Sequence, residues 1–360
     1  MFNIKKQINK LYITSILANL SITGAWVAIL AARGFSLIKI GFAETVFHIT
    51  SLIFEIPSGV FADVFGRKRI LVISHIMTII GNVIMVLNDS FVTVCFSFVF
   101  FALGYNFSSG SDDALAYDSL KSVNQESRYE KYSSNQLIIY RIGNAFSTLC
   151  AGVALMLGYK TAYTISALTD IAALMFIFTL KEIRVNDDDA KLMSRIIRCF
   201  ADSLIFLRNE KKAVALMMCN SAVGAIDILL LFFLQAKLLE VGLKDFALGV
   251  ALFAMELGGM LGAKLILKFN HIRYRNILFI CLIGVSSGIL LEHTGLYTIM
   301  TLGGFLSAMA DDALQVRTNT KLQDMFPSDK RATLISIESF TFSIIMIVLS
   351  PLAGFFFSKW

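Results

Sequence analysis

The chain has 360 residues, of which 56% are hydrophobic and only 16% are charged, whereas an ordinary soluble domain has about 25% charged residues. Its mean hydropathy is +0.71. A soluble core cannot use that much apolar surface, so we expect lipid to be the solvent. The net charge of +6 does not indicate nucleic-acid binding, because the Lys and Arg residues lie between apolar blocks and form no continuous basic face.

Eleven apolar segments predict eleven membrane-spanning helices, each long enough to cross a hydrocarbon layer of about 30 Å. Helices are expected because they satisfy their own backbone hydrogen bonds in lipid. The segment after Lys10 lacks a convincing cleavage site and many spans follow it, so we interpret it as the first helix and not as a signal peptide. The predicted helices lie at about 11–32, 37–62, 69–88, 91–113, 134–157, 160–180, 212–236, 245–267, 275–292, 295–316 and 332–357.

The basic residues predict the orientation of the chain. With a cytoplasmic N-terminus, 25 of the 32 Lys and Arg residues lie in segments on the cytoplasmic side, six lie on the outer side, and Arg141 lies within a helix. Loops rich in Lys and Arg stay in the cytoplasm. We therefore expect a multi-pass protein of the plasma membrane with its N-terminus in the cytoplasm.

The longest loop divides the predicted chain into three parts. Residues 1–180 form an N-terminal bundle of six helices, residues 181–211 a cytoplasmic linker, and residues 212–360 a C-terminal bundle of five helices. Within the linker, apolar residues recur at helical spacing while Arg195 and Arg198 fall on other faces. This pattern predicts a basic amphipathic helix that lies on the inner leaflet.

The two halves share short sequence matches at equivalent places. The sequence Asp-Asp-Ala-Leu occurs at 112–115, where the fourth predicted helix ends, and again 199 residues later at 311–314, where the tenth ends. The basic segments 58–69 and 261–275 follow the second and the eighth helices. These matches predict two pseudo-symmetric bundles with a substrate site between them.

The most specific motif is Ser-Gly-Val-Phe-Ala-Asp-Val-Phe-Gly-Arg-Lys-Arg at 58–69. Gly66 permits a tight turn between two helices, and the basic residues at 67–69 hold that turn in the cytoplasm. Asp63 lies at the C-terminal end of a helix, where the helix dipole disfavours a carboxylate by about 0.3–1 kcal/mol. Asp63 therefore needs a partner, such as the start of the eleventh helix at 328–331.

This segment resembles the signature loop of the major facilitator superfamily, in which Gly and Asp precede a Gly-Arg turn with further basic residues. The segments Phe-Glu-Ile-Pro at 54–57 and Tyr-Asp-Ser-Leu-Lys at 117–121 are similar to a bacterial branch of that family. The resemblance implies an all-α integral membrane protein of the major facilitator fold, with bundles of six and five helices. It also implies secondary active transport by alternating access, with Asp63, Arg67 and Arg69 paired across bundles as a cytoplasmic gate.

Two further groups are assigned to this gate. Asp112 and Asp113 are expected near the cytoplasmic end of the fourth helix, and Arg141 in the first turns of the fifth, on the same side. The simplest interpretation is that these residues form a charge pair, or latch, that holds the gate closed. The predicted gate comprises Gly59, Asp63, Gly66, Arg67, Lys68, Arg69, Asp112, Asp113, Arg141 and Arg331.

Ionisable residues inside the predicted helices need a reason, because a charge deep in a membrane helix costs at least about 2.5 kcal/mol. Glu44, His48, Ser51 and Glu55 are spaced four, three and four residues apart, so they share one face of the second helix. Such a row of titratable groups predicts a proton path made of Glu44, His48 and Glu55. Hydrogen bonding to neighbouring helices is the alternative interpretation, and the sequence leaves it open.

Other polar residues predict a central substrate cavity. An acidic and aromatic cavity favours a cationic amphiphile through charge and cation–π contacts, although each residue could equally serve packing. Asp170 could equally be a structural hydrogen-bond acceptor. The predicted cavity residues are Asn19, Trp26, Tyr105, Asn106, Asn220, Asp227, Glu256 and Glu338.

The sequence contains no Walker loop, no Ser-His-Asp arrangement and no metal-ligand cluster, so we expect neither an enzyme nor a cofactor or metal site. We predict a proton-coupled transporter that exports a small amphiphilic or cationic compound. Its partners are the lipid bilayer, the small-molecule substrate and protons, and we expect a monomer. Two alternatives stay open: uptake of a metabolite by proton symport, and a non-transporting, receptor-like or truncated member of the fold. The second is slightly favoured by eleven predicted helices where the superfamily usually has twelve.

Overall fold

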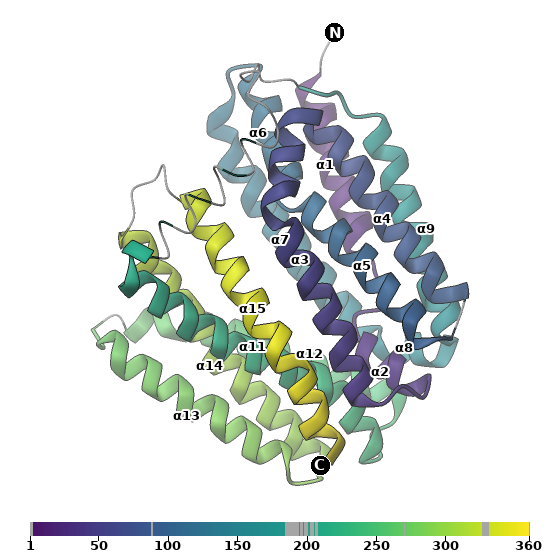
Figure 1. Ribbon diagram of the computed structural model, residues 1–360, viewed down its shortest axis with the longest axis vertical. Helices are drawn as coiled ribbons and strands as arrows, with labels where there is room; N and C mark the ends of the chain where they lie inside the picture. Colours follow the sequence, from purple (N-terminus) through teal and green to yellow (C-terminus); the bar gives the residue numbers. More distant parts are fainter. Residues whose placement is uncertain are drawn as a thin grey trace. The chain divides into compact units, whose positions relative to one another are not determined.

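The computed structural model places only helices along the part of the chain that it describes (Figure 1). The predicted interfacial helix of the linker at 181–211 falls largely outside that part. The side chains of Asp63 and Arg331 are also outside it. The described residues are 3–87, 89–183, 194, 197, 201, 205, 208–269, 271–325 and 331–359.

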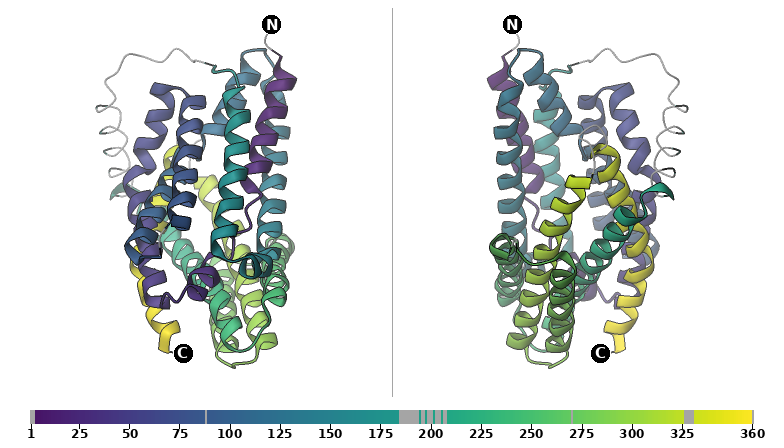
Figure 2. Two further views of the ribbon diagram at one scale, coloured as in Figure 1. Left: turned by 90° about the vertical axis from the view of Figure 1, so that its right-hand side faces the viewer. Right: turned by 90° about the vertical axis from the view of Figure 1, so that its left-hand side faces the viewer.

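The first compact unit comprises Met1–Gly24, Val46–Ser147 and Leu157–Asp202. Within it, α4 packs against α5 and α9, and α1 packs against α9. Figure 2 shows these helices running alongside one another. A buried apolar cluster that includes Leu11, Leu71 and Tyr132 joins α1, α4 and α7. The helices of this unit are α1 (Ile4–Asn19), α4 (Arg67–Leu87), α5 (Phe91–Ser108), α6 (Ser111–Lys121), η1 (Glu126–Arg128), α7 (Tyr129–Leu149) and α9 (Tyr159–Phe178).

The second compact unit comprises Ala25–Thr45, Thr148–Met156 and Ser203–Trp360. In it, α14 packs against α11, α12 and α13, and α11 also packs against α15. The division into an N-terminal bundle, a linker and a C-terminal bundle stays a prediction, since short segments from the first half of the chain group with this unit. Its helices are α2 (Trp26–Ala32), α8 (Ala151–Leu157), α11 (Lys211–Glu240), α12 (Asp245–Leu265), η2 (Ile266–Phe269), α13 (Tyr274–Glu292), α14 (Tyr297–Met325) and α15 (Arg331–Lys359).

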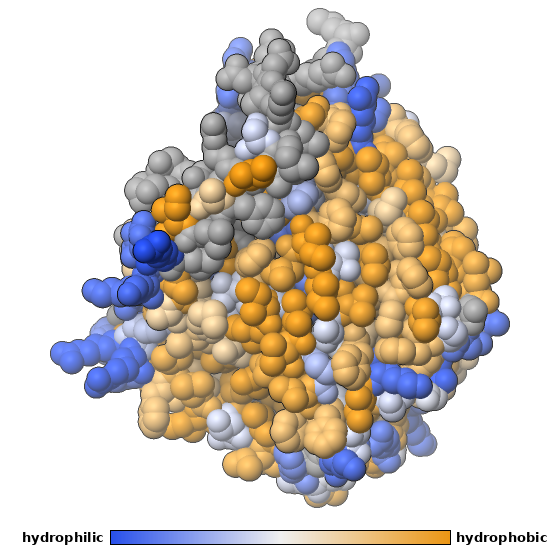
Figure 3. Space-filling model, in the orientation of Figure 1, coloured by the Kyte–Doolittle hydropathy of each residue, from blue (hydrophilic) through white to orange (hydrophobic). Residues whose placement is uncertain are grey.

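Eight of the described helices are long and apolar enough to cross a membrane, and a ninth is counted if α7 and α8, bent by 49°, form one broken span. The long helix α3 (Leu37–Phe65) is among the eight, although it contains Pro57. Apolar side chains cover the region of α4 and α5 on the face shown in Figure 3. Such broad apolar surfaces mark contact with a membrane. Exposed side chains in these two helices include Ile76, Val83, Leu87, Val92 and Phe96.

Several predicted helix boundaries are wrong. The predicted helix at 11–32 is interrupted between Asn19 and Trp26, so α1 and α2 are separate helices. The fourth predicted helix breaks at Gly110, whose φ is +73°, and continues as α6 to Lys121. The tenth continues through its Asp-Asp pair to Met325. The aspartate pairs at 112 and 311 therefore do not end helices.

The contact between α12 and α14 depends on a residue without a side chain. At Gly262, a Cβ atom would collide with the backbone carbonyl of Met309. The two helix backbones therefore approach each other more closely than any larger residue permits. Small residues give membrane helices this kind of contact.

We predict that Gly262→Ala lowers the stability of the protein by about 1–3 kcal/mol, since the added methyl group pushes α14 away. Gly59→Ala is the matched control, because a Cβ there meets nothing within 4 Å and alanine favours a helix by about 1 kcal/mol. Thermal unfolding of the purified protein in detergent measures both. Equal unfolding temperatures for the two variants would contradict this account of the contact.

Candidate functional site

The turn between α3 and α4 is a single residue, Gly66, with a φ of +100°. Only glycine adopts this backbone conformation without strain. A side chain would also clash, since its Cβ would lie 2.7 Å from Glu182 Oε2. Lys68 anchors the same turn to the end of α9: its Nζ donates to Phe178 O at 2.9 Å, and its backbone N–H donates to Glu182 Oε1 at 3.3 Å.

Arg67 binds within its own unit. Its Nη1 donates to Ala114 O at 2.7 Å and forms an ion pair with Asp118 on α6. The Asp118 side chain is 7% exposed and that of Arg67 is 22% exposed, so the pair is largely withdrawn from solvent. Arg69 is exposed. Sequence reasoning identified the Tyr-Asp-Ser-Leu-Lys segment at 117–121 only as a family feature and missed the role of Asp118 as the partner of Arg67.

The structure does not bring Arg141 together with the Asp112–Asp113 pair, and the role of these residues in a gate stays a prediction. Among the described residues no ion pair joins them, and Arg141 is exposed on α7. Both aspartates lie in the first turn of α6, where the helix dipole stabilises a carboxylate. Asp112 Oδ1 accepts from the backbone N–H of Asp113 at 2.8 Å. The break at Gly110 supplies this helix N-terminus.

The predicted proton path lies on α3, which is continuous from Leu37 to Phe65. Glu44, His48 and Ser51 are buried, and Glu55 is half-buried. Ser51 and Asn106 form two hydrogen bonds of 2.9 Å. The charge of Glu55 acts on Tyr105 of the same unit. Two predicted cavity residues, Tyr105 and Asn106, thus lie beside the predicted proton path, whose role stays a prediction.

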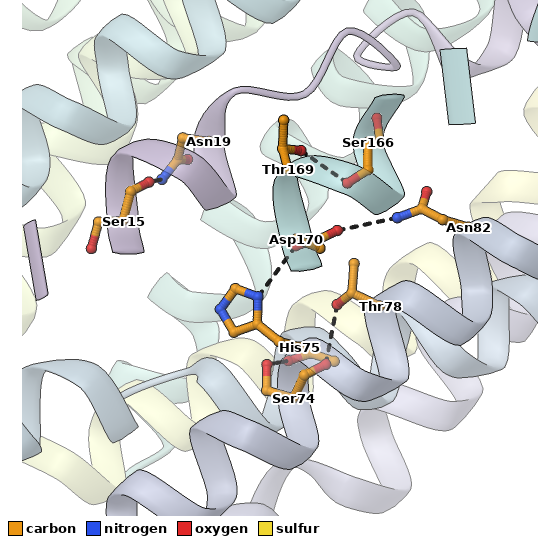
Figure 4. A network of polar contacts seen from close by, with 10 residues as sticks. Ser15, Asn19, Ser74, His75, Thr78, Asn82, Ser166, Thr169 and Asp170 are labelled. Atoms are coloured by element: carbon orange, nitrogen blue, oxygen red, sulfur yellow. Dashed lines mark hydrogen bonds and ion pairs between the residues drawn. The ribbon is translucent and has the colours of Figure 1, made fainter. Parts of the chain in front are cut away.

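A buried polar network connects α4 with α9 in the first unit (Figure 4). His75 Nδ1 lies 3.3 Å from Asp170 Oδ1, and Asn82 Nδ2 donates to Asp170 Oδ2 at 3.1 Å. The side chains of His75 and Asp170 are 9% and 11% exposed. Asp170 is therefore a hydrogen-bond acceptor between helices. Sequence reasoning did not identify His75, although a histidine inside an apolar span is itself a signal.

The remaining predicted cavity residues do not all meet. In the first unit, Asn19 Nδ2 donates to Ser15 O on its own helix at 2.8 Å. In the second unit, Asn220 Nδ2 lies 3.4 Å from Glu338 Oε1, and Glu256 Oε1 accepts from Thr148 Oγ1 at 2.9 Å. The ring of Trp26 meets Phe232 edge-on. Their joint lining of one cavity stays a prediction.

Asp227 differs from these residues because its neighbours are other carboxylates. It is 4% exposed on α11, and its charge acts on Glu292 of α13 and Asp311 of α14. Within the described residues, no three His, Cys, Asp or Glu side chains are arranged to hold a metal ion. Sequence reasoning missed Glu292, which is the last residue of its helix, and expected Asp311 at a helix end.

The comparisons with known proteins agree with a helical membrane protein. The family model described as Major Facilitator Superfamily matches residues 11–351. The chain belongs to the Major Facilitator Superfamily. It is therefore a membrane transporter of this superfamily and not an enzyme.

Individual relatives are distant. The chain is 24% identical to YxaM, an uncharacterised transporter of the superfamily from Bacillus subtilis (strain 168), over 87% of this chain and 79% of the relative. The crystal structure of a single-residue mutant of the nucleoside transporter NupG matches 98% of this chain and 96% of its own, with a TM-score of 0.75 and 13% identity. A bacterial homologue of the human lysosomal transporter Spinster, solved inward-facing and unoccupied, has a TM-score of 0.72 and 18% identity, over 96% of this chain and 81% of its own. These structures establish the superfamily fold for this chain.

We predict that Asp170→Ala destabilises the protein by about 3–5 kcal/mol, because it leaves the buried partners of that carboxylate unsatisfied. The double variant His75→Ala with Asp170→Ala should cost less than the two single variants added together, since residues in contact are not additive. Thermal unfolding in detergent provides the double-mutant cycle.

Glu240→Ala serves as the control for this cycle. Glu240 pairs with Lys237 at 2.7 Å, but its side chain is 54% exposed, so its loss should cost only about 0.2–1 kcal/mol. Strictly additive effects at His75 and Asp170 would show that the two side chains are not coupled.

Proposed function

We propose that the protein is a proton-coupled secondary transporter of the plasma membrane that exports a small amphiphilic or cationic compound by alternating access. The observation that carries this proposal is the row of titratable residues on α3. Glu44 and His48 are buried, Glu55 is half-buried, and the same helix ends at the Gly66 turn. A membrane protein retains ionisable groups at such positions for function.

The driving force is adequate for this task. One charge that crosses a potential of 100 mV releases about 2.3 kcal/mol. At 1.36 kcal/mol per decade, this sustains a concentration gradient of about fifty-fold. For an uncharged substrate, coupling to one proton therefore supports substantial export without ATP. For a monovalent cation the two charges cancel, and the pH gradient supplies the driving force.

The basic turn at Gly66 would serve as the cytoplasmic gate, together with Asp63. Arg67 is already committed to Asp118 and Ala114, which favours a role in holding the turn on its own bundle. Lys68 is likewise bound to Phe178 O in its own unit. Asp63, Arg69 and Arg331 are therefore the gate residues that would act between the bundles.

We predict that purified protein in vesicles moves the lipophilic cation tetraphenylphosphonium when a pH gradient is imposed. Nigericin, which collapses the gradient, should abolish the flux. Glu44→Gln and Glu55→Gln should each lower the flux about ten-fold or more while protein levels stay normal, since glutamine keeps the shape but cannot release a proton. Depletion of the probe from the cytoplasmic side indicates export, and its accumulation there indicates uptake.

Wild-type flux that ignores the pH gradient would refute proton coupling. Loss of the protein from the membrane in both glutamine variants would instead support a purely structural role for these residues. Glu240→Gln is a suitable control, because this exposed carboxylate forms an ion pair with Lys237 and lies away from α3 in the chain.

A second prediction concerns the gate. Asp63→Asn should slow transport while it leaves membrane insertion intact, because the gate loses a charge but the helix keeps its length and polarity. Tetraphenylphosphonium flux, normalised to the amount of inserted protein, measures the effect. Asp89→Asn is the same substitution at a carboxylate that accepts from Tyr159 Oη at 2.6 Å. An unchanged rate for Asp63→Asn would remove Asp63 from the gate.

A further inference from the structure

Three carboxyl groups from three different helices are buried inside the second unit. Asp227 on α11 is 4% exposed, Glu292 on α13 is 1% exposed, and Asp311 on α14 is 7% exposed. Carboxylates are almost never this deeply buried unless they are paired. This group of buried carboxyls is separate from the row of titratable residues on α3.

The three carboxyl groups lie along one face of α14, the helix that carries Asp311. Gly303, Ser307 and Asp311 are four residues apart, so they share a face and succeed one another at steps of about 6 Å. A Cβ atom at Gly303 would lie 3.0 Å from Glu292 Cγ, which places Glu292 beside the first of these steps. Ser307 lies beside Asp227 at the second step, and its buried hydroxyl has no hydrogen-bond partner within the described residues.

Asp311 forms the third step. Its Oδ1 lies 3.5 Å from the position of a Cβ at Gly224, one turn before Asp227 on α11. The carboxyl groups thus lead from the end of the unit where α13 finishes to the middle of α14.

The carboxylates at the start of this row have oxygens without hydrogen-bond partners. Neither oxygen of Glu292 has a hydrogen-bond partner in the described residues, and Asp227 Oδ1 has none either. The charges that act on Glu292 and Asp311 come from other carboxylates, Asp227 and Asp312. Three anions in one apolar interior repel one another, and burial disfavours the charge of each.

Within the described residues, no other titratable group near the row forms a hydrogen bond with the carboxylate of Glu292. His293 follows Glu292, but its Nδ1 faces Ile289 O at 2.7 Å. His293 also lines an apolar pocket of about 540 Å³ together with Lys359 of α15. Asp312 turns toward α12, where its carboxylate lies against Gly259. Cys281 of α13 also lies near Asp311.

We propose that Glu292, Asp227 and Asp311 form a proton relay inside the second unit, with the hydroxyl of Ser307 between them. This proposal rests on the proton coupling proposed above and names a second site for it, in addition to the row on α3. A proton enters at Glu292 and passes to Asp227 and then to Asp311. At each transfer one carboxyl O–H bond breaks and another forms on the next group, with Ser307 able to both donate and accept. Protons suit the row better than a metal ion, because no group of three or more ligating side chains converges in the described residues.

Infrared spectroscopy of the purified protein in lipid tests the relay without a substrate. The wild type should show the C=O band of protonated carboxyl groups at neutral pH. Glu292→Gln, Asp227→Asn and Asp311→Asn should each remove part of that band, whereas Glu240→Gln should leave it unchanged. Three separate variants are used because any one of them could fail to fold. Thermal unfolding shows whether each variant is folded.

A band that all three variants leave intact would overturn the relay. A band that disappears when NaCl is added at fixed pH would also overturn it, since sodium would then be the ligand. Flux adds the functional measurement: the variants should lose about ten-fold or more of the tetraphenylphosphonium flux driven by a pH gradient, yet keep the exchange of labelled for unlabelled probe. Wild-type flux that ignores the gradient, together with a band that the variants remove, would refute the proposed coupling and support the relay as a proton-binding site.

Discussion

The structure depends on one constraint: the hydrocarbon layer offers no hydrogen bonds to the protein. Backbone polar groups are therefore satisfied inside helices, and the described chain is helical almost throughout. Where a helix breaks, the freed groups need new partners. At Gly110 the break creates a helix N-terminus, and the Asp112–Asp113 pair occupies it. At Gly66 the break is stabilised by Glu182 and by the contact of Lys68 with Phe178 O.

The same constraint explains the polar pairs between helices. Asp170 satisfies both His75 and Asn82, Ser51 pairs with Asn106 through two hydrogen bonds, and Asp118 neutralises Arg67. Each pair joins residues far apart in the chain and so fixes which helices are neighbours. Because apolar packing alone does not distinguish one lipid-facing helix surface from another, these polar contacts are where the sequence specifies the arrangement within a unit.

The helices and the Gly66 turn could be predicted from the sequence, because hydropathy and a glycine beside basic residues are local signals. The contact partners of individual side chains could not be predicted from the sequence. Nothing near Arg67 in the sequence indicates Asp118, which is 51 residues away. The end of the tenth helix was misplaced because polar residues after Asp311 look like a loop, yet α14 continues to Met325. For the same reason Asp311 was assigned to a helix end, where it could not have joined Asp227 and Glu292.

Buried charged groups differ in whether they have a partner of opposite charge, and this difference bears on where coupling can reside. In the first unit, His75 with Asp170 and Arg67 with Asp118 are matched pairs. In a matched pair each charge stabilises the charge of the other. In the second unit, Glu292 and Asp227 carry unsatisfied oxygens and face further carboxylates. Such groups gain free energy when they bind a proton, and the gain is lost when water reaches them. A transporter that alternates between exposed and enclosed states would take up and release protons at groups of this second kind, which is why these carboxylates join the row on α3 as candidates for coupling.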